Sequence, residues 1–200
     1  VKKSWVDGKN QDGKRTDSVT VALKKGNETI KTVTLNDDNN WAHTESGLDK
    51  YADSALISYS WEEVNVPDGY RVTYEVDEDE TTVTNTHTPE KTEATVNKVW
   101  VDGNNQDGKR PATLDVTLYK VIGDNRSKVE DVTLNEDNNW TATVEDLPLY
   151  DNGTQVTYEW TEDKADLPEG YTLTGTGVEG TITTLTNSYT PELTEATIKK

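Results

Sequence analysis

The sequence contains one domain-sized pattern twice, and this repeat decides how the chain is divided. The motif KSWVDGKNQDGKR, which starts at Lys3, returns as KVWVDGNNQDGKR at Lys98. All six tryptophans fall into matched pairs: Trp5 with Trp100, Trp41 with Trp140 and Trp61 with Trp160. A chain of 200 residues is long enough for one large domain or two small ones. The repeat indicates two copies of one domain.

The motifs at the domain ends set the expected boundaries. TPEKTEATVNK (residues 88–98) leads from the first copy into the second, and TPELTEATIKK (residues 190–200) begins the same passage again. We therefore expect a first domain without the start of its first strand, a second domain, and the start of a third, over residues 1–89, 90–191 and 192–200. The polar residues 90–93 are expected to form a short linker, so that adjacent repeats lie end to end.

The composition excludes several classes of protein. The formal net charge is −18, and the lysines are interspersed with more numerous acids, which argues against nucleic acid as a partner. No apolar run approaches the roughly 18 residues of a membrane span, and nothing at the N-terminus resembles a signal peptide. Hydrophobic residues make up 31% of the chain and cysteine is absent, so each domain has a modest core and no disulfide. We expect a monomer with no cofactor and no metal.

Apolar and polar residues alternate with a period of two in each copy, which is typical of β-strands. In the second copy the pattern covers four segments rich in threonine, valine and aromatic residues, namely residues 115–121, 139–147, 154–162 and 181–189. Turn motifs such as QDGK, IGDN, YDNG and LPEG separate the strands, and no segment has a helical stripe. The sequence predicts an all-β sandwich with about seven strands per domain.

Strand alternation places a lysine on an inward face. Residues two apart in a strand point to the same side, so Lys98 shares a face with Val96 and Trp100. Two further polar side chains of the second copy, Asn187 and Glu162, fall on faces that their aromatic neighbours mark as inward. The first copy repeats this set with Lys3, Asn85 and Glu63.

Such a trio has a chemical interpretation and a simpler one. Burial lowers the pKa of an amine and raises that of a carboxyl, so the amine can be a neutral nucleophile and the carboxyl a proton donor. The acid then polarises the carboxamide while the amine attacks and ammonia leaves, which forms an amide crosslink. In the simpler interpretation Lys98 snorkels to the strand edge, Glu162 is a solvated strand end and Asn187 caps a turn. Strand parity alone favours the simpler interpretation.

The repeated motifs also resemble a known family. KVWVDGNNQDGKRP, VTLNEDNNW, LPLYDNG, YEWTED, LPEGYT and LTNSYTP follow one another in the second copy, and the match covers both copies nearly end to end. Together they are similar to the B-type repeat of Cna-like collagen adhesins, the CnaB domain of Gram-positive surface proteins and pilins. The resemblance implies a transthyretin-like or inverse immunoglobulin β-sandwich, repeated as a stalk of a secreted adhesin that is anchored to the cell wall. Other domains of such an adhesin are expected to bind the host ligand.

The resemblance further implies a spontaneous intramolecular Lys–Asn isopeptide bond that an acidic residue promotes. By motif, the lysine corresponds to Lys98 of NKVW, the asparagine to Asn187 of LTNSYTP and the acid to Glu162 of YEWTE. In the first copy the same motifs select Lys3, Asn85 and Glu63. These are the positions that strand parity marks as inward, so the resemblance favours the crosslink over the simpler interpretation.

Three features of the sequence bear on these assignments. Lys2 adjoins Lys3 and Glu62 adjoins Glu63, and a β-bulge would exchange the members of either pair. Parity selects Lys3 and Glu63. Lys200 matches the reactive lysine of a third copy and has no partner in this sequence, so it is expected to stay free.

Three other functions compete with a structural stalk. An enzyme that acts on external substrates is disfavoured because there is no Ser-His-Asp pattern, no cysteine, and only two histidines, at unmatched positions. An adhesin module that recognises host extracellular matrix needs exposed aromatic residues, whereas the repeated tryptophans are more simply explained as core. The loops DGKNQDG (residues 7–13) and DGNNQDG (residues 102–108) resemble calcium loops, but their spacing fits Asx turns better.

Overall fold

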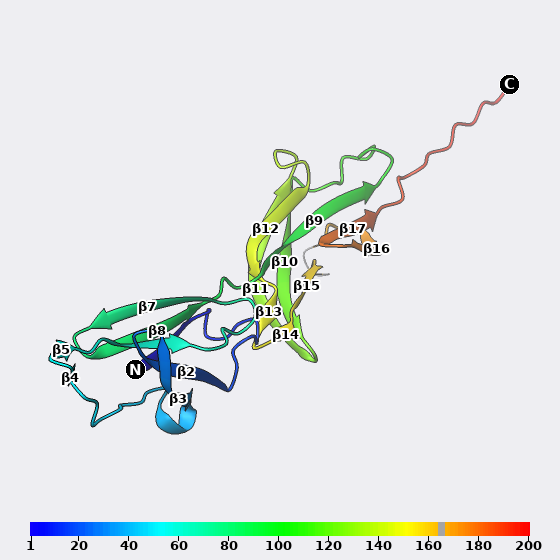
Figure 1. Cartoon of the computed structure of the whole chain (residues 1–200). Helices are drawn as coiled ribbons and strands as arrows, with labels where there is room; N and C mark the ends of the chain where they lie inside the picture. Colours follow the sequence, from blue (N-terminus) through cyan, green and yellow to red (C-terminus); the bar gives the residue numbers. More distant parts are fainter. Residues whose placement is uncertain (164–166) are drawn as a thin grey trace. The chain divides into compact units, whose positions relative to one another are not determined.

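The computed structural model of the protein describes residues 1–163 and 167–200 (Figure 1). Nearly all regular structure is β-strand, and the helical structure among the described residues is a single 3-10 turn, Asp37–Asn39. The chain divides into two compact units. The first comprises Val1–Glu90 with Tyr150–Thr154, and the second comprises Lys91–Leu149 with Gln155–Lys200. The prediction of an all-β chain is confirmed.

Two three-stranded sheets make up most of the first unit. One sheet has the order β1-β8-β7, with bounds Lys2–Val6, Glu80–Thr86 and Arg71–Asp77. The other has the order β3-β2-β6, with bounds Glu28–Asn36, Ser18–Lys25 and Tyr59–Glu63. A small hairpin completes the unit, with strands β4 (Tyr51–Ala52) and β5 (Ala55–Leu56).

The second unit has the same plan with a fourth strand in one sheet. That sheet has the order β12-β9-β17-β16, with bounds Thr141–Pro148, Lys91–Val101, Ile182–Ser188 and Thr172–Glu179. The facing sheet has the order β11-β10-β15, with bounds Asn125–Asn135, Thr113–Ile122 and Thr157–Thr161. After β12 the short strands β13 (Tyr150–Asp151) and β14 (Thr154–Gln155) pair with each other, and residues 150–154 of this hairpin belong to the first unit.

Side chains from both sheets form the core of the second unit, as expected for a sandwich. Val96 of β9 and Leu185 of β17 belong to one sheet, and Leu118 of β10 and Trp160 of β15 belong to the other. The first unit has a smaller buried cluster of Val19, Val21 and Leu35. Of the repeated tryptophans, Trp140 and Trp160 are buried, and the other four are half-buried and pack against these clusters.

The first and last long strands of each unit lie side by side and run parallel. In the first unit β1 pairs with β8, and in the second unit β9 pairs with β17 (Figure 1). The chain therefore enters and leaves each sandwich on neighbouring strands. A bond between these two strands encloses nearly the whole domain.

The predicted linker is wrong. Residues 91–93 belong to β9, where Lys91 pairs with Pro148 and Thr92 pairs with Leu147. The outward positions of a strand tolerate charged side chains, so a polar composition does not exclude a strand. Residues 192–200 form no strand, and their Leu193 and Ile198 are almost fully exposed.

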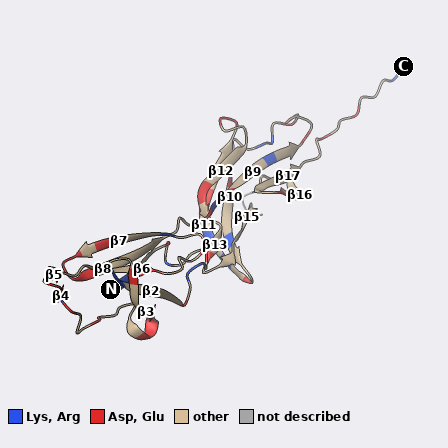
Figure 2. Ribbon diagram, in the orientation of Figure 1, with Lys and Arg blue, Asp and Glu red and all other residues tan. Residues whose placement is uncertain are grey.

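Acidic side chains are spread over the surface of both units. In Figure 2 red segments are visible on β7 and β12, and the 3-10 turn carries Asp37 and Asp38. An excess of one charge keeps molecules apart in solution. In the part of the chain that is described, no helix has the length and apolar character needed to cross a membrane.

Candidate crosslink sites

The parallel pairing of β9 and β17 brings a lysine and an asparagine onto one inward face. Lys98 lies opposite Leu185, and Asn187 lies opposite Trp100 on the same pair of strands. Because side chains alternate, Lys98 and Asn187 are diagonal neighbours that point to the same side. Glu162 follows the end of β15 in the facing sheet and is buried.

The lysine and glutamate of the second unit meet in the interior. Lys98 Nζ lies 3.5 Å from Glu162 Oε2, and both side chains are fully buried. Lys98 Nζ also donates hydrogen bonds to the carbonyl oxygens of Leu185 at 3.1 Å and Val99 at 3.4 Å. It lies 4.6 Å from the ring centroid of Trp100, which restricts where the amine can move.

In the first unit a single carboxylate contacts both the lysine and the asparagine. Lys3 Nζ lies 3.5 Å from Glu63 Oε2, and Asn85 Nδ2 donates a hydrogen bond of 2.9 Å to Glu63 Oε1. The side chains of Lys3 and Glu63 are fully buried, and Asn85 is completely inaccessible. Glu63 therefore bridges the amine of one strand and the carboxamide of its neighbour.

These sites retain buried polar atoms that have no hydrogen-bond partner. They are Asn85 Oδ1, Glu162 Oε1 and both side-chain amide atoms of Asn187, while Glu63 Oε2 and Glu162 Oε2 have only the lysine Nζ 3.5 Å away as a partner. Leaving one buried polar group unsatisfied costs about 1 to 3 kcal/mol, so groups retained in this way need an explanation. In each unit these atoms belong to the asparagine, whose side-chain amide an isopeptide bond would replace, and to the glutamate, which would contact the new bond.

Burial changes the protonation of the two lysines. Desolvation lowers the pKa of Lys98 from 10.5 to about 8, against the opposing effect of Glu162. Desolvation likewise lowers the pKa of Lys3 to about 8, opposed by Glu63. Near neutral pH an appreciable fraction of each amine is therefore uncharged and can act as a nucleophile.

The simpler interpretation of the lysine does not fit the structure. The side chain of Lys98 has no exposed area, so it does not snorkel, and Glu162 is a buried residue. The neighbouring residues that a bulge would have exchanged, Lys2 and Glu62, are exposed. Lys200 is exposed at the end of the chain.

A second buried network was not predicted as such from the sequence. Asp102 is 2% exposed and accepts two hydrogen bonds from Arg110, one from the Tyr171 hydroxyl and one from the Asn105 backbone. Arg110 is the main cause of the fall in the Asp102 pKa to about 2. The first unit repeats the network with Asp7, Arg15, Tyr70 and Asn10. The signal was present in the sequence, because Asp, Arg and Tyr recur at matched places.

In this network Asp102 and Asp7 each accept a hydrogen bond from the backbone N–H three residues later. The carboxylates of Asp102 and Asp7 that the calcium interpretation used are occupied by arginine, tyrosine and backbone donors. Among the described residues, no group of three or more His, Cys, Asp or Glu side chains is placed to hold a metal ion. The aspartates of the loops that precede β2 and β10 are therefore bound by arginine and tyrosine side chains of the protein itself.

Comparison with known proteins decides the family. The family model of the Cna protein B-type domain matches residues 1–86 and again residues 94–188. The chain belongs to the Cna protein B-type domain family. Both matches coincide with the tandem copies seen in the sequence, so each copy is one B-type domain.

Individual B-type relatives agree with this assignment. The chain is 42% identical over its whole length to a collagen adhesin of Staphylococcus aureus, of which it covers 16%. The crystal structure of two B repeat units (B1B2) of the collagen binding protein of S. aureus is 38% identical, with a TM-score of 0.79. That match covers 95% of this chain and 48% of the other. Two tandem B-type domains of this protein thus share the fold of the S. aureus repeats.

Proposed function

We propose that the chain is part of the structural stalk of a bacterial surface adhesin anchored to the cell wall. In this proposal residues 1–89 and 90–191 are two repeats and residues 192–200 begin a third. Each repeat is closed by an isopeptide bond, Lys3 to Asn85 in the first and Lys98 to Asn187 in the second, and Glu63 and Glu162 promote the reaction. The observation that carries the proposal is the burial of Lys and Asn on the adjacent first and last strands, with the Glu of the facing sheet 3.5 Å from the lysine.

The reaction proceeds without a cofactor. Glu162 takes a proton from Lys98, and the neutral Nζ attacks Cγ of Asn187, so that a new C–N bond forms. The bond from Cγ to Nδ2 breaks, and the carboxyl of Glu162 relays a proton from the attacking nitrogen to the departing one. Amine and carboxamide become amide and ammonia. Each site reacts once, so the domain is not an enzyme in the sense of turnover.

The position of the bond explains a mechanical function. A pulling force that enters the second domain along β9 reaches Lys98, crosses the amide to Asn187 and leaves along the end of β17. The residues between them carry no load, because the covalent path bypasses them. Such a domain cannot be extended without breaking a covalent bond, and reducing agents do not reverse the linkage. These properties suit a spacer that holds a binding domain away from the cell.

Ligand binding is proposed to lie outside these domains. The chain covers 16% of the S. aureus collagen adhesin, so the greater part of that relative has no counterpart here. The contacts of a stalk repeat are the adjacent repeats of its own chain, and the molecule is expected to be a monomer. The alternative is that these domains themselves recognise host matrix; direct binding of collagen to the 200-residue chain would favour it.

Intact mass measurement tests the crosslinks directly. We expect the protein to be lighter than its sequence mass by two ammonia molecules, one for each domain. Lys3→Ala and Lys98→Ala should each restore one ammonia, and Glu63→Gln or Glu162→Gln should slow the loss in its own domain. Lys2→Ala is the matched control, because Lys2 is exposed beside Lys3, and it should leave both losses intact. A protein of full sequence mass would end the proposal.

A further inference from the structure

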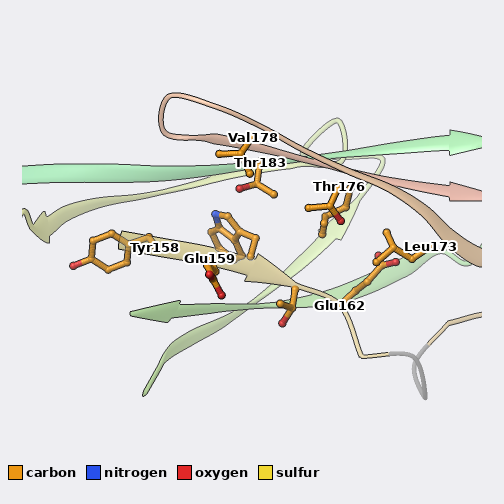
Figure 3. Close-up of a pocket in the computed structure, with 10 residues that line it drawn as sticks. Tyr158, Glu159, Glu162, Leu173, Thr176, Val178 and Thr183 are labelled. Atoms are coloured by element: carbon orange, nitrogen blue, oxygen red, sulfur yellow. The ribbon is translucent and has the colours of Figure 1, made fainter. Parts of the chain in front are cut away.

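The second domain has a pocket on the open edge between its two sheets (Figure 3). Its volume is about 350 Å³, at the lower end of the range of small-molecule sites. The apolar wall consists of Trp160, Leu173, Val178 and Leu185. Glu162 and its strand β15 form one side, and the edge strand β16 forms the other.

In the first domain a tyrosine closes the same edge. Tyr74 of β7 pairs with Val83, which lies opposite Lys3. Its hydroxyl reaches the other sheet and accepts a hydrogen bond of 3.0 Å from the backbone N–H of Glu63. The side chain of Tyr74 therefore joins β7 to the end of β6 beside the crosslink site.

Strand register identifies the residue that replaces this tyrosine. Thr176 of β16 pairs with Leu185, which lies opposite Lys98, so Thr176 is the counterpart of Tyr74. Thr176 lines the pocket, and its side chain is much smaller than that of the tyrosine it replaces. The second domain therefore leaves open the place that a phenol ring fills in the first.

The pocket also has a polar group that suits a phenol. The Glu162 backbone N–H is the counterpart of the one that binds Tyr74, since Glu63 and Glu162 occupy equivalent places at the ends of edge strands β6 and β15. An apolar cleft with a few polar groups is the usual form of a small-ligand site.

We propose that this pocket binds a para-substituted phenol, the chemical group of a tyrosine side chain. The ring lies against Trp160 and Leu185, and the hydroxyl oxygen accepts a hydrogen bond from the Glu162 N–H. The ligand supplies in the second domain the contact that Tyr74 supplies in the first. Glu162 belongs both to this pocket and to the proposed crosslink site.

The test is a titration of the ¹⁵N-labelled 200-residue chain with p-cresol, followed by NMR. The signals of the Glu162 amide and the Trp160 indole should shift, and those of Glu63 and Trp61 should not. Toluene, which lacks only the hydroxyl, should bind about fivefold more weakly, the factor expected for one hydrogen bond. Equal binding of toluene, or no shift at Glu162 and Trp160 up to the solubility limit, would overturn the proposal.

Two variants of Thr176 make the test specific. Thr176→Tyr should fill the pocket, abolish p-cresol binding, and move the Glu162 and Trp160 signals towards their bound positions in the free protein. Thr176→Val keeps the size of the side chain and leaves the pocket open, so p-cresol should still shift the Glu162 and Trp160 signals. A folded Thr176→Tyr variant that still binds p-cresol would contradict the site, and an unchanged dispersion of the other amide signals shows that the variant is folded.

A peptide distinguishes the two sources of the phenol. The heptapeptide RVTYEVD has the sequence of β7, and RVTFEVD is its control without the hydroxyl. If RVTYEVD binds more tightly than p-cresol and RVTFEVD does not, the ligand is a tyrosine carried by an extended chain. If p-cresol binds and RVTYEVD does not, the ligand is a small free phenol. Both results support a phenol site.

Discussion

The two domains have the same Lys–Glu–Asn set in different surroundings. In the first, Glu63 contacts both Lys3 and Asn85, and a tyrosine covers the edge beside it. In the second, Glu162 contacts Lys98, and the edge beside it is an open pocket. The two domains therefore share the Lys–Glu–Asn set but differ in how the sandwich edge beside it is closed. The domains should therefore differ in their free energy of unfolding and in the access of small molecules to the sandwich edge. The proposed isopeptide bond should form in both.

The largest expected effect comes from removing one crosslink. Asn187→Ala leaves Lys98 without an acceptor, so the second domain loses a loop closure between residues 89 positions apart. By the chain-entropy relation used for disulfides, this lowers the free energy of unfolding by about 4 to 5 kcal/mol. Hydrogen exchange in increasing denaturant, resolved by domain, measures the change. Asn85→Ala should give nearly the same loss in the first domain, where the bond spans 82 positions.

The comparison between domains provides the control. Each variant should leave the exchange of the other domain unchanged. In single-molecule pulling, the natural chain should show no full-length unfolding step, and each variant should gain one. A full-length unfolding step in an unsubstituted domain would contradict the proposed route of the force through the isopeptide bond, even if the intact mass shows both crosslinks.

The next largest effect depends on pH and requires the uncrosslinked domain. In Asn187→Ala the Lys98 amine remains, with a folded pKa of about 8 against 10.5 in the unfolded chain. Between these values the unfolded state binds more protons, so the stability of the second domain should rise with pH. The rise from pH 8 to 10.5 should be about 3 kcal/mol. Urea unfolding at a series of pH values measures it.

A matched variant isolates this effect. Lys98→Met with Asn187→Ala removes the titrating amine, so its stability should show no such rise with pH. The first domain should behave in the same way in Asn85→Ala, because desolvation lowers the Lys3 pKa equally. A flat profile in both single variants would mean that the lysines are solvated before the bond forms.

Strand parity carried most of the site prediction. Alternation in a strand has a fixed period of two, so one tryptophan beside Lys98 was enough to mark its face as inward. The same argument placed Asn187 and Glu162, and each of the three residues is buried. Local composition was less reliable, as residues 91–93 show, because pairing with β12 depends on a partner some 55 residues away.

The residues that distinguish the two domains could not be found in this way. The equivalence of Tyr74 and Thr176 depends on a register shift in β16 between Leu173 and Gly175, which displaces a simple alignment by one position. His87 contacts Asp12, a turn residue 75 positions away in the sequence, and strand parity does not predict the contacts of turn residues. The sequence does show that His87 stands where the second copy has Tyr189, but not what either residue contacts.

A further contrast lies where the chain leaves each domain. His87 contacts Asp12 Oδ2 through Nε2 at 2.7 Å and the carbonyl oxygen of Gly69 through Nδ1 at 2.9 Å. In the second domain the Tyr189 hydroxyl donates to Asp107 Oδ2 at 3.0 Å. The first exit is thus closed by a histidine that contacts two oxygens, and the second by a tyrosine hydroxyl that contacts one.

Substitution of these two residues should therefore have unequal effects. His87→Phe leaves the buried carboxylate of Asp12 with fewer donors and should lower the stability of the first domain by about 2 kcal/mol, against about 1 kcal/mol for Tyr189→Phe in the second. Burial alone would raise the Asp12 pKa, but hydrogen bonds from His87 and the Glu90 N–H outweigh it and hold the pKa below 3.8. Acid unfolding of His87→Phe should begin at higher pH, since the stabilisation by Asp12 is lost as pH falls through its folded pKa. Equal losses in both variants would show that the second contact of His87 adds nothing.

The smallest expected effect concerns the edge that Tyr74 closes. Tyr74→Phe keeps the ring and removes the hydrogen bond from the Glu63 N–H, so the first domain should lose about 1 kcal/mol of stability. The matched change in the second domain, Thr176→Val, removes a hydroxyl from the equivalent position and should cost less, because Thr176 lines an open pocket. Hydrogen exchange of the Glu63 and Glu162 amides reports each edge separately. Faster exchange at Glu63 in Tyr74→Phe, without any change in the intact mass, would establish that edge closure and covalent crosslinking stabilise this fold independently.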